Sequence, residues 1–519
     1  MKSLSILNDV LGPVMRGPSS SHTAGSYHIG RLARYLFGAE PAGAVIRFDP
    51  GGSYARVYRD QGSDLGFAAG LMGWEITDAR FPQALEAARE RGLPIRFVVD
   101  PLERADHPNT VEMELWGADR PSLRLVARSV GGGAVEIVTL GEWSLCLAGN
   151  AFERLVEVEP WAADAIQGLL EADALKDPER QEKEGRVLIR VPAARPLSEG
   201  EERMLLAHLG VHGVWTAPPL GWVVRGRPLF SGAHEMLAYV RQQGVSLGEA
   251  AAAYEAALLG VAEEDVYAEM DRRLGIMEAA VERGLGEGLE MQLLVPTAGK
   301  ILRAEAAGKL ALGGLHTRAG ARAMAVMHVS SSMGVICAAP TAGAAGVLPG
   351  VLVTLIEEQQ LERREAVRAL LAAGAVGLVV GGQATFAAEE AGCQVEIGAA
   401  GAMAAAAVVE AAGGTAEQAF DAAAIALQNA MGSVCDPVQG IVEIPCHTRN
   451  AAAAASAFVC ADLILGGYEN PVPLDETVEA VRAVGCLLPV ELRCTALGGL
   501  AQAPSAQRLR RRRRIQAGA

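Results

Sequence analysis

The sequence has few aromatic residues and little positive charge. Aromatic side chains make up 5% of the 519 residues, whereas hydrophobic residues reach 50% and glycine occupies 60 positions. A chain of this composition is globular and packs with small side chains, which excludes intrinsic disorder and a collagen-like fold. The balance of 46 basic against 61 acidic residues gives a net charge of −15. That sign argues against a protein whose main partner is the phosphate backbone of a nucleic acid.

Residues 1–25 lack the continuous apolar stretch and the cleavage site of a secretory signal. We therefore expect a cytoplasmic protein. Apolar runs at 369–388 and 451–467 approach membrane-spanning length, but they consist largely of Ala and Gly, and the second contains Asp462. We expect both runs to be buried helices, and we expect no membrane partner.

The first part of the chain, residues 1–148, alternates between two kinds of pattern and predicts an α+β domain. The strand-like runs lie at 44–49, 94–99, 110–115 and 134–140, and the helix-like runs lie at 26–36 and 82–91.

The rest of the chain divides into three further segments. Residues 149–228 follow the order β-α-β-α-β, which favours a degenerate ferredoxin-like regulatory module, one strand short, or alternatively a structured linker. Residues 229–505 are amphipathic and Ala-rich, which predicts a helical catalytic domain. Residues 506–519 form a basic tail, which we expect to be a solvated terminus. The predicted fold class is therefore multidomain α+β.

The eight cysteines include no CxxC pair, so the spacing fails the zinc-ribbon and ferredoxin templates. Cys393, Cys435 and Cys446 stand beside Gly, Asp-Pro or Pro, which puts their sulfurs at loops or helix ends where backbone N–H groups stabilise a thiolate. Three thiolates without an obvious fourth suggest a metal site with an open position. From spacing alone, these three cysteines are as well explained as buried structural thiols as they are as metal ligands. We interpret the remaining late cysteines as buried structural thiols: Cys460, Cys486 and Cys494.

Long motifs give a more specific signal. The helical segment contains SSMGVICAAPTAGAAGVLPG (331–350), AGCQVEIG (391–398) and CDPVQGIVEIPCHTRN (435–450), and the first segment contains GPSSSHTAG (17–25) and HPNTV (107–111). Together these motifs resemble the iron-sulfur-dependent bacterial L-serine dehydratases. The chain looks like the β and α portions of that family fused in one polypeptide.

The resemblance implies a 4Fe-4S cluster held by Cys393, Cys435 and Cys446, with the fourth iron left for L-serine. An iron that takes the substrate's carboxylate and hydroxyl withdraws charge and helps hydroxide to leave, while a base removes the Cα proton. The resulting aminoacrylate tautomerises and hydrolyses to pyruvate and ammonia, and no pyridoxal phosphate is required. The family's habit also implies a homodimer.

The same resemblance supplies candidate pocket residues. In the first domain these are the loop residues Ser19, Ser20, Ser21, His22 and Thr23, together with His107. In the helical domain they are Thr341, Gly343, Arg449, Asn450 and Lys300. Thr341 and Gly343 suit a hydroxyl donor and a close backbone approach, whereas Arg449 and Asn450 suit hydrogen bonds to sulfur or carboxylate. A solvated helix lysine remains an equal alternative for Lys300, and Cys337 fits a pocket wall better than a ligand position.

One position departs from the family pattern. Gln61 stands where the family has the histidine expected to act as general base. A glutamine cannot accept the Cα proton, so either the local alignment is shifted, His22 or His107 takes the role, or the chain has reduced or altered activity.

These observations leave three hypotheses. The first is an L-serine dehydratase, a carbon-nitrogen lyase of amino-acid catabolism. The second is a related desulfidase or hydro-lyase acting on another small β-substituted acid. The third is a non-catalytic serine-sensing paralogue, and Gln61 is the one feature in its favour.

Overall fold

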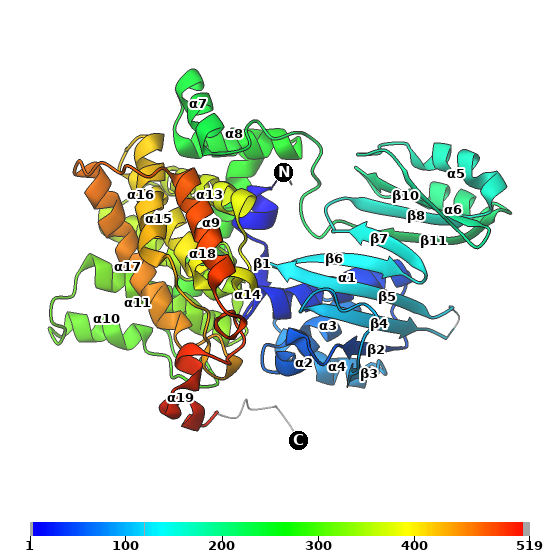
Figure 1. Cartoon of the computed structure of the whole chain (residues 1–519), viewed down its shortest axis with the longest axis horizontal. Helices are drawn as coiled ribbons and strands as arrows, with labels where there is room; N and C mark the ends of the chain where they lie inside the picture. Colours follow the sequence, from blue (N-terminus) through cyan, green and yellow to red (C-terminus); the bar gives the residue numbers. More distant parts are fainter. Residues whose placement is uncertain (1–3, 119, 512–519) are drawn as a thin grey trace. The chain divides into compact units, whose positions relative to one another are not determined.

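The computed structural model describes residues 4–118 and 120–511 (Figure 1). Contacts divide them into two compact units, one of residues 21–225 and one that joins residues 4–20 to 226–511. The division into four segments predicted from the sequence stays a prediction, because a division by contacts does not test those boundaries. Residues 512–519 of the predicted basic tail lie outside the described residues.

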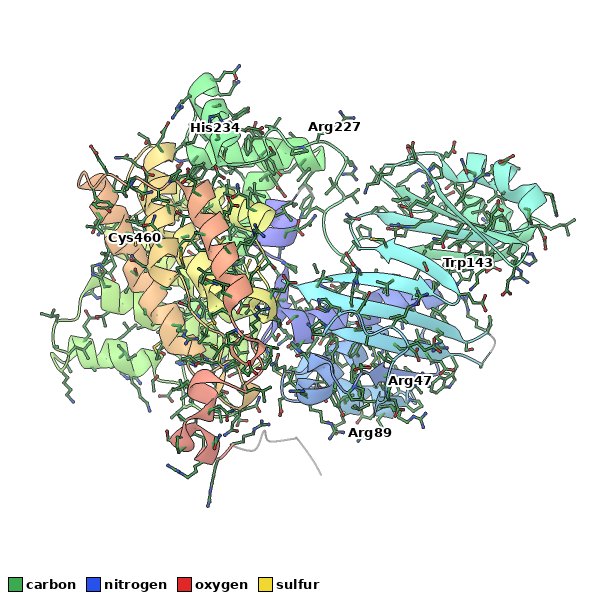
Figure 2. All side chains as sticks on the ribbon, viewed as in Figure 1. Arg47, Arg89, Trp143, Arg227, His234 and Cys460 are labelled. Atoms are coloured by element: carbon green, nitrogen blue, oxygen red, sulfur yellow. The ribbon has the colours of Figure 1, made fainter. Side chains whose placement is uncertain are left out.

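The unit of residues 21–225 begins with a mixed sheet beside short helices. Within its described residues the strand order is β3-β2-β4-β5-β6-β7, with β2 and β3 parallel and the other neighbours antiparallel. The strands are β2 (Gly43–Phe48), β3 (Ile95–Val99), β4 (Thr110–Trp116), β5 (Leu123–Gly131), β6 (Ala134–Leu140) and β7 (Trp143–Leu147), and the helices are α1 (Gly25–Phe37), α2 (Ser53–Val57), α3 (Ser63–Leu71) and α4 (Ala84–Glu90). Arg47 on β2, labelled in Figure 2, pairs across the sheet with Glu112 at 3.0 Å and Glu114 at 3.2 Å on β4.

Helix α1 packs closely on α3 as well as on β5 and β6. Gly66 permits this approach, because a Cβ atom at that position would lie 2.5 Å from the carbonyl oxygen of Thr23 and 3.0 Å from the backbone nitrogen of Tyr27. Real Cβ atoms do not approach backbone atoms so closely, so the spacing of the two helices depends on a missing side chain. His22 lies in the short π-helical turn η2 (Ser20–Ala24), which leads directly into α1, so this packing also fixes one end of that turn.

A second sheet follows in the same unit and has the ferredoxin-like order β11-β8-β10-β9. Its elements are β8 (Phe152–Val158), α5 (Ala163–Leu170), β9 (Glu179–Lys183), β10 (Arg186–Ala193), α6 (Glu199–Ala207) and β11 (Val211–Ala217). The strand missing from the sequence prediction is β9, which pairs antiparallel with β10. Its sequence, ERQEK, is almost fully exposed, so it carries none of the apolar alternation by which strands are recognised.

The other unit is predominantly helical, which confirms the predicted multidomain α+β class. Its helices are α7 (Ala233–Gln243), α8 (Leu247–Leu259), α9 (Glu263–Leu285), α10 (Ala298–Ala306), α11 (Leu315–Ser331), α12 (Val347–Gln359), α13 (Arg363–Gln383), α14 (Ala388–Ala391), α15 (Ile397–Ala411), α16 (Ala416–Ala430), α17 (Cys446–Leu465), α18 (Leu474–Leu487) and α19 (Pro504–Arg508).

Helix α15 lies at the centre of this unit, in contact with α12, α13, α16 and α17 (Figure 1). The segments 363–383 and 393–411 are long and apolar enough to cross a membrane, but 78% and 94% of their apolar windows are buried inside the protein. Small Ala and Gly side chains let these helices approach one another, so we assign both segments to the core of the unit.

The N-terminal segment belongs to the helical unit rather than to the sheet that follows it in sequence. The Glu255 carboxylate on α8 accepts hydrogen bonds from the backbone nitrogens of Ile6 at 2.7 Å and Leu7 at 3.0 Å, at the start of the helical turn η1 (Ile6–Val10). Strand β1 (Val14–Arg16) then pairs antiparallel with β12 (Val335–Cys337), which leads into the CAAPTAG motif.

We expect Gly66→Ala to lower the free energy of unfolding of the sheet-containing unit by about 1–3 kcal/mol, because the added methyl group must displace the backbone of α1. The matched control is Gly168→Ala in α5, where nothing lies within 4 Å of the added Cβ atom. That substitution should leave the stability unchanged or raise it by about 0.5–1 kcal/mol. Thermal unfolding followed by circular dichroism measures both variants, and equal midpoints would contradict the close approach.

Candidate active site

Three cysteines predicted as ligands stand on turns of the helical unit. Cys393 opens the short turn η6 (Cys393–Val395) after Gly392, whose φ of 77° is a conformation that favours glycine. Cys435 precedes Asp436 in an extended loop, and Cys446 begins α17 directly after Pro445. A helix N-terminus favours negative charge, an effect that opposes the cost of burying a thiolate at Cys446.

The sulfurs of the site interact with one another. Hydrogen bonds join the sulfur of Cys435 to those of Cys393 and Cys494, and these bonds together with burial hold the pKa of the Cys435 thiol well above its ordinary value. The Cys435 hydrogen bond is the main reason that the pKa of Cys393 is lowered. Burial, reinforced by the nearby charges of Cys393 and Glu396, raises the pKa of Cys446. The three predicted ligands therefore form one buried, electrostatically linked group.

Arg449 lies beside this group, one helical turn after Cys446. Its guanidinium donates to the Cys393 sulfur at 3.6 Å and to the Val434 carbonyl at 2.8 Å, and it pairs with Asp436 at 3.0 Å. A thiolate at Cys393 is thus next to a cation that is already neutralised by a carboxylate. Asp436 in turn accepts a hydrogen bond from the backbone nitrogen of Leu500 at 2.7 Å, which ties a later segment to the same loop.

Two buried polar side chains fix the loops that carry these groups. Glu443 accepts hydrogen bonds from the backbone nitrogens of Gln292, Leu293 and Leu294 at 2.7, 2.9 and 2.7 Å. Asn450 donates to the Gly343 and Cys446 carbonyls, both at 2.9 Å, and accepts from the backbone nitrogen of Gly346 at 3.1 Å. Asn450 therefore connects the CAAPTAGAAG loop to the N-terminus of α17.

Glu396 is a member of the site that the sequence analysis did not single out. One of its carboxylate oxygens and the sulfurs of Cys393 and Cys435 all lie within 4.8 Å of one another. A Cβ atom at Gly343 would lie 3.6 Å from Oε1 of Glu396 and 3.8 Å from the Thr341 hydroxyl. The predicted pocket residues Thr341 and Gly343 thus meet the cysteine group at this carboxylate. The available signal was its place in AGCQVEIG, three residues after Cys393.

The remaining cysteines differ in their surroundings. Cys494, interpreted from the sequence as a structural thiol, instead lies against Cys435: its backbone nitrogen donates to the Cys435 carbonyl at 2.8 Å, in addition to the contact between sulfurs. Cys460 on α17, labelled in Figure 2, contacts Asn429 and Ser456. Cys337 contacts the Leu11 carbonyl at 3.6 Å, and burial raises its pKa to about 11. Cys486 is exposed.

In the sheet-containing unit, His22 is buried and contacts Ser21, Ser53 and Tyr54. Its Nε2 atom lies 2.9 Å from the Ser53 hydroxyl and its Nδ1 atom 3.1 Å from the Ser21 hydroxyl, while its ring meets Tyr54 edge to face. Burial lowers the pKa of His22 to about 4, so the imidazole is neutral at physiological pH. Thr23, also predicted for the pocket, donates to the Gln61 carbonyl at 2.6 Å. Ser19 and Ser20, which precede this loop, are buried.

The HPNTV loop reaches the same region of this unit through Ser53, whose backbone nitrogen donates to the Pro108 carbonyl at 2.7 Å. The His107 Nδ1 atom accepts from the backbone nitrogen of Asn109 at 3.0 Å, so this imidazole orders its own loop. Gln61 is buried, with 4% of the residue exposed. The hydroxyl and imidazole residues of the two motifs are therefore brought together around Ser53.

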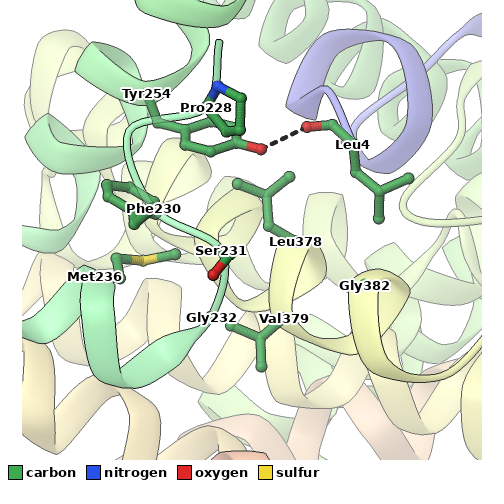
Figure 3. A pocket seen from close by; sticks show the side chains of 10 residues that line it. All are labelled: Leu4, Pro228, Phe230, Ser231, Gly232, Met236, Tyr254, Leu378, Val379 and Gly382. Atoms are coloured by element: carbon green, nitrogen blue, oxygen red, sulfur yellow. Dashed lines mark hydrogen bonds between the residues drawn. The ribbon is translucent and has the colours of Figure 1, made fainter. Parts of the chain in front are cut away.

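Two cavities lie elsewhere in the helical unit. Lys300 lines one of about 190 Å³ with Arg303 and the Gly-rich turn at 284–288, and its described contacts do not reach the cysteine group. The other, of about 70 Å³, is lined mainly by apolar side chains, and the Tyr254 hydroxyl within it donates to the Leu4 carbonyl at 2.9 Å (Figure 3). Neither cavity is lined by the three predicted cysteine ligands or by the pocket residues predicted from the CAAPTAG and CHTRN motifs.

The comparisons with known proteins agree with the motifs. The family model described as "Serine dehydratase alpha chain" matches residues 229–501. The "Probable L-serine dehydratase, alpha chain" of Bacillus subtilis (strain 168) is 40% identical over 287 residues, which cover 55% of this chain and 95% of the relative. The chain belongs to the serine dehydratase family.

Further relatives match both portions of the chain. The "L-serine dehydratase, alpha chain" of Peptoniphilus asaccharolyticus is 38% identical over 281 residues, covering 54% of this chain and 96% of the relative. The "Probable L-serine dehydratase, beta chain" of Bacillus subtilis is 41% identical over 150 residues, covering 29% of this chain and 66% of the relative. The family resemblance and the fusion of α-type and β-type sequences are thus confirmed, and the cysteine-rich group is consistent with an iron-sulfur cluster.

We expect Glu443→Ala to lower the free energy of unfolding of the helical unit by about 3 kcal/mol or more, because three buried N–H groups lose their acceptor. Hydrogen exchange at residues 292–294 should accelerate in the same variant. Glu282→Ala, an exposed substitution on α9, is the control and should change stability by less than about 0.5 kcal/mol. Unchanged protection of the amides of residues 292–294 would contradict the role assigned to Glu443.

Proposed function

We propose that this chain is an iron-sulfur L-serine dehydratase, a cytoplasmic carbon-nitrogen lyase that converts L-serine to pyruvate and ammonia. The observation that carries the proposal is the convergence of Cys393, Cys435 and Cys446 within a unit that matches the serine dehydratase α chain. The reaction removes the Cα proton and the β-hydroxyl of serine as water. Aminoacrylate then tautomerises to the imine, which hydrolyses to the two products.

The residues present fit a cluster, because thiols on separate turns gather in one buried group beside a cation. We propose that Cys393, Cys435 and Cys446 hold a 4Fe-4S cluster, and that no pyridoxal phosphate takes part. When bound, such a cluster supplies an iron that acts as a Lewis acid toward the serine carboxylate and hydroxyl. Cys494 adds a further thiol beside Cys435, outside the proposed ligand set.

The chain's own groups orient the substrate and manage charge. Arg449 donates to the Cys393 sulfur, which stabilises thiolate charge at that ligand. Thr341 and Gly343 offer a hydroxyl and an open backbone beside the sulfurs, and Asn450 holds their loop in place. These roles are consistent with a small polar substrate, because Gly343 has no side chain and leaves room beside the sulfurs. The structure brings no contact that supports the predicted role of Lys300, which stays a prediction.

We further propose that His22 accepts the Cα proton, with His107 ordering the loop beside it. The lowered pKa of His22, about 4, keeps its imidazole in the neutral form, which has a nitrogen lone pair able to accept a proton, whereas the amide of Gln61 has no such basic atom. The family resemblance supports this assignment, and the hydrogen bonds of His22 to Ser21 and Ser53 hold the ring in one orientation. The resemblance likewise supports a homodimer and candidate substrate contacts from Ser19, Ser20, Ser21 and Thr23.

Gln61 favours a second candidate function, a serine-sensing paralogue without catalysis. This glutamine occupies a buried position next to the His22 loop, where the family pattern has its base. A desulfidase or hydro-lyase acting on another small β-substituted acid would use the same cluster chemistry. Only a comparison of substrates distinguishes such an enzyme from an L-serine dehydratase.

We expect the anaerobically purified chain to be brown, to contain iron and sulfide, and to form pyruvate from L-serine faster than from L-threonine or L-cysteine. Replacing Cys393, Cys435 or Cys446 by Ser should abolish both the visible absorption and the activity, because each proposed ligand is needed to retain the cluster. Cys460→Ser, on α17 away from the sulfur group, is the control and should keep both.

Three outcomes would change this conclusion. Equal bleaching by Cys494→Ser would revise the ligand set, and faster turnover of L-cysteine would favour a desulfidase. A colourless, zinc-loaded protein with full activity would reject the cluster.

We expect His22→Ala to lower turnover of L-serine by roughly two orders of magnitude or more, the usual effect of losing a general base. Iron content and visible absorption should stay at the parental level. Because the pKa of His22 is lowered to about 4, its base form is lost only as pH falls toward 4, so its acid limb should lie well below pH 6.5. His234→Ala, an exposed position on α7, is the control (Figure 2).

The same assay tests the sensor hypothesis. Gln61→His should raise activity or leave it unchanged if His22 is the base. If His22→Ala and His107→Ala both kept parental turnover while Gln61→His created activity from nothing, the chain would be a silenced paralogue.

A further inference from the structure

Glu396 is placed to meet a ligand beside the cysteines. It follows the turn of Cys393 and precedes α15, and one of its carboxylate oxygens lies within 4.8 Å of the sulfurs of Cys393 and Cys435. The vacant Cβ position of Gly343 is 3.6 and 3.7 Å from its two oxygens. The side chain is partly exposed, unlike Cys393 and Cys435, so it retains an accessible face. A small molecule that reaches the sulfurs therefore also meets this carboxylate.

The carboxylates around the site differ in how their charge is balanced. Asp436 pairs with Arg449 at 3.0 Å, and Glu443 accepts hydrogen bonds from three backbone N–H groups. Within the described residues, no Lys, Arg or His lies within ion-pairing distance of Glu396. Among the described residues, Glu396 is thus a carboxylate beside the sulfurs that lacks a compensating cation.

A second polar group converges on the same place. The hydroxyl of Thr341 is buried and hydrogen-bonds to the Glu396 carboxylate. The Thr341 Oγ1 atom lies 3.8 Å from the vacant Cβ position of Gly343, on the side of Glu396. A hydroxyl that donates to a carboxylate keeps its oxygen lone pairs, so Thr341 is still able to accept a hydrogen bond from a ligand. A ligand that satisfies both groups carries a positive charge and several N–H donors.

We propose that Glu396 binds the α-ammonium group of the amino-acid substrate, with the Thr341 hydroxyl accepting a second hydrogen bond. The proposal rests on the proposed function, whose substrate has one cationic group. An ammonium ion supplies both the missing positive charge and the donors, while the substrate's carboxylate and hydroxyl remain free for the metal. Glu396 then determines that the site takes an amino acid rather than the corresponding hydroxy acid without nitrogen.

The test compares two ligands on the loaded, full-length protein. L-Serine and 3-hydroxypropanoate share the carboxylate and the hydroxyl and differ in the ammonium group. Binding of each is measured from the change in the visible absorption of the cluster on rapid anaerobic mixing, before turnover consumes L-serine. Iron and sulfide content are determined on the same samples. The variants are Glu396→Gln, which removes the charge and keeps the shape, and Glu390→Gln, an exposed charge control on α14.

Glu396→Gln should weaken L-serine binding by roughly 10- to 150-fold, the range for a hydrogen bond to a charged group, and leave 3-hydroxypropanoate binding unchanged or tighter. Glu390→Gln should bind both compounds as the parent does. Equal weakening of both compounds in Glu396→Gln, or no weakening of either, would overturn the ammonium role. Loss of iron from Glu396→Gln alone would overturn it in favour of Glu396 as a ligand of the cluster.

The proposed function fails separately. A parent protein that binds L-serine but forms no pyruvate would reject the dehydratase activity, while the selective loss in Glu396→Gln would still support the ammonium contact. A parent protein that binds neither compound would reject both.

Discussion

The geometry of the cysteine group depends on buried polar side chains that hydrogen-bond to the backbone of distant loops. The thiols stand on turns, whose backbone groups are not satisfied by a helix or sheet, and an unpaired buried N–H group is costly. Glu443 meets three such groups, Asp436 meets one, and Asn450 bridges two loops. Ala-rich helices such as α15 provide a close-packed frame, but they contribute few groups able to position a sulfur. The precision of the site therefore comes from a small set of carboxylates and amides.

The fold class could be predicted from the sequence because the spacing of hydrophobic residues along a short segment indicates whether that segment forms a strand or a helix. The alternation at 44–49, 110–115 and 134–140 and the Ala-rich helical pattern correspond to observed strands and helices. Strand β9 was not predicted, because ERQEK is polar on both faces and pairs only with β10 among the described strands. The membership of residues 4–20 in the helical unit escaped as well, since the pairing of β1 with β12 joins residues far apart in the chain.

For the site, the motifs carried the information and the spacing did not. The three cysteines were singled out by turn chemistry and by resemblance, but gaps of tens of residues left their proximity open. Cys494 stands in no such motif, and its contact with Cys435 arises from tertiary packing. Glu396 was inside a quoted motif, yet an acidic residue beside an α-helix has many ordinary explanations. What distinguishes it is the lack of a counter-charge, which is a property of the folded environment.

The pairing of β1 with β12 also has a consequence for how the chain tolerates change. It closes a loop of roughly 320 residues that contains the whole sheet-bearing unit, and the entropic cost of closure grows only with the logarithm of loop length, about 0.6 kcal/mol for each doubling. Lengthening, shortening or exchanging the ferredoxin-like module within that loop therefore costs the helical unit almost nothing. The pairing of β1 with β12 holds the start of the CAAPTAG loop in place. The intervening module is therefore free to vary in length without moving that loop.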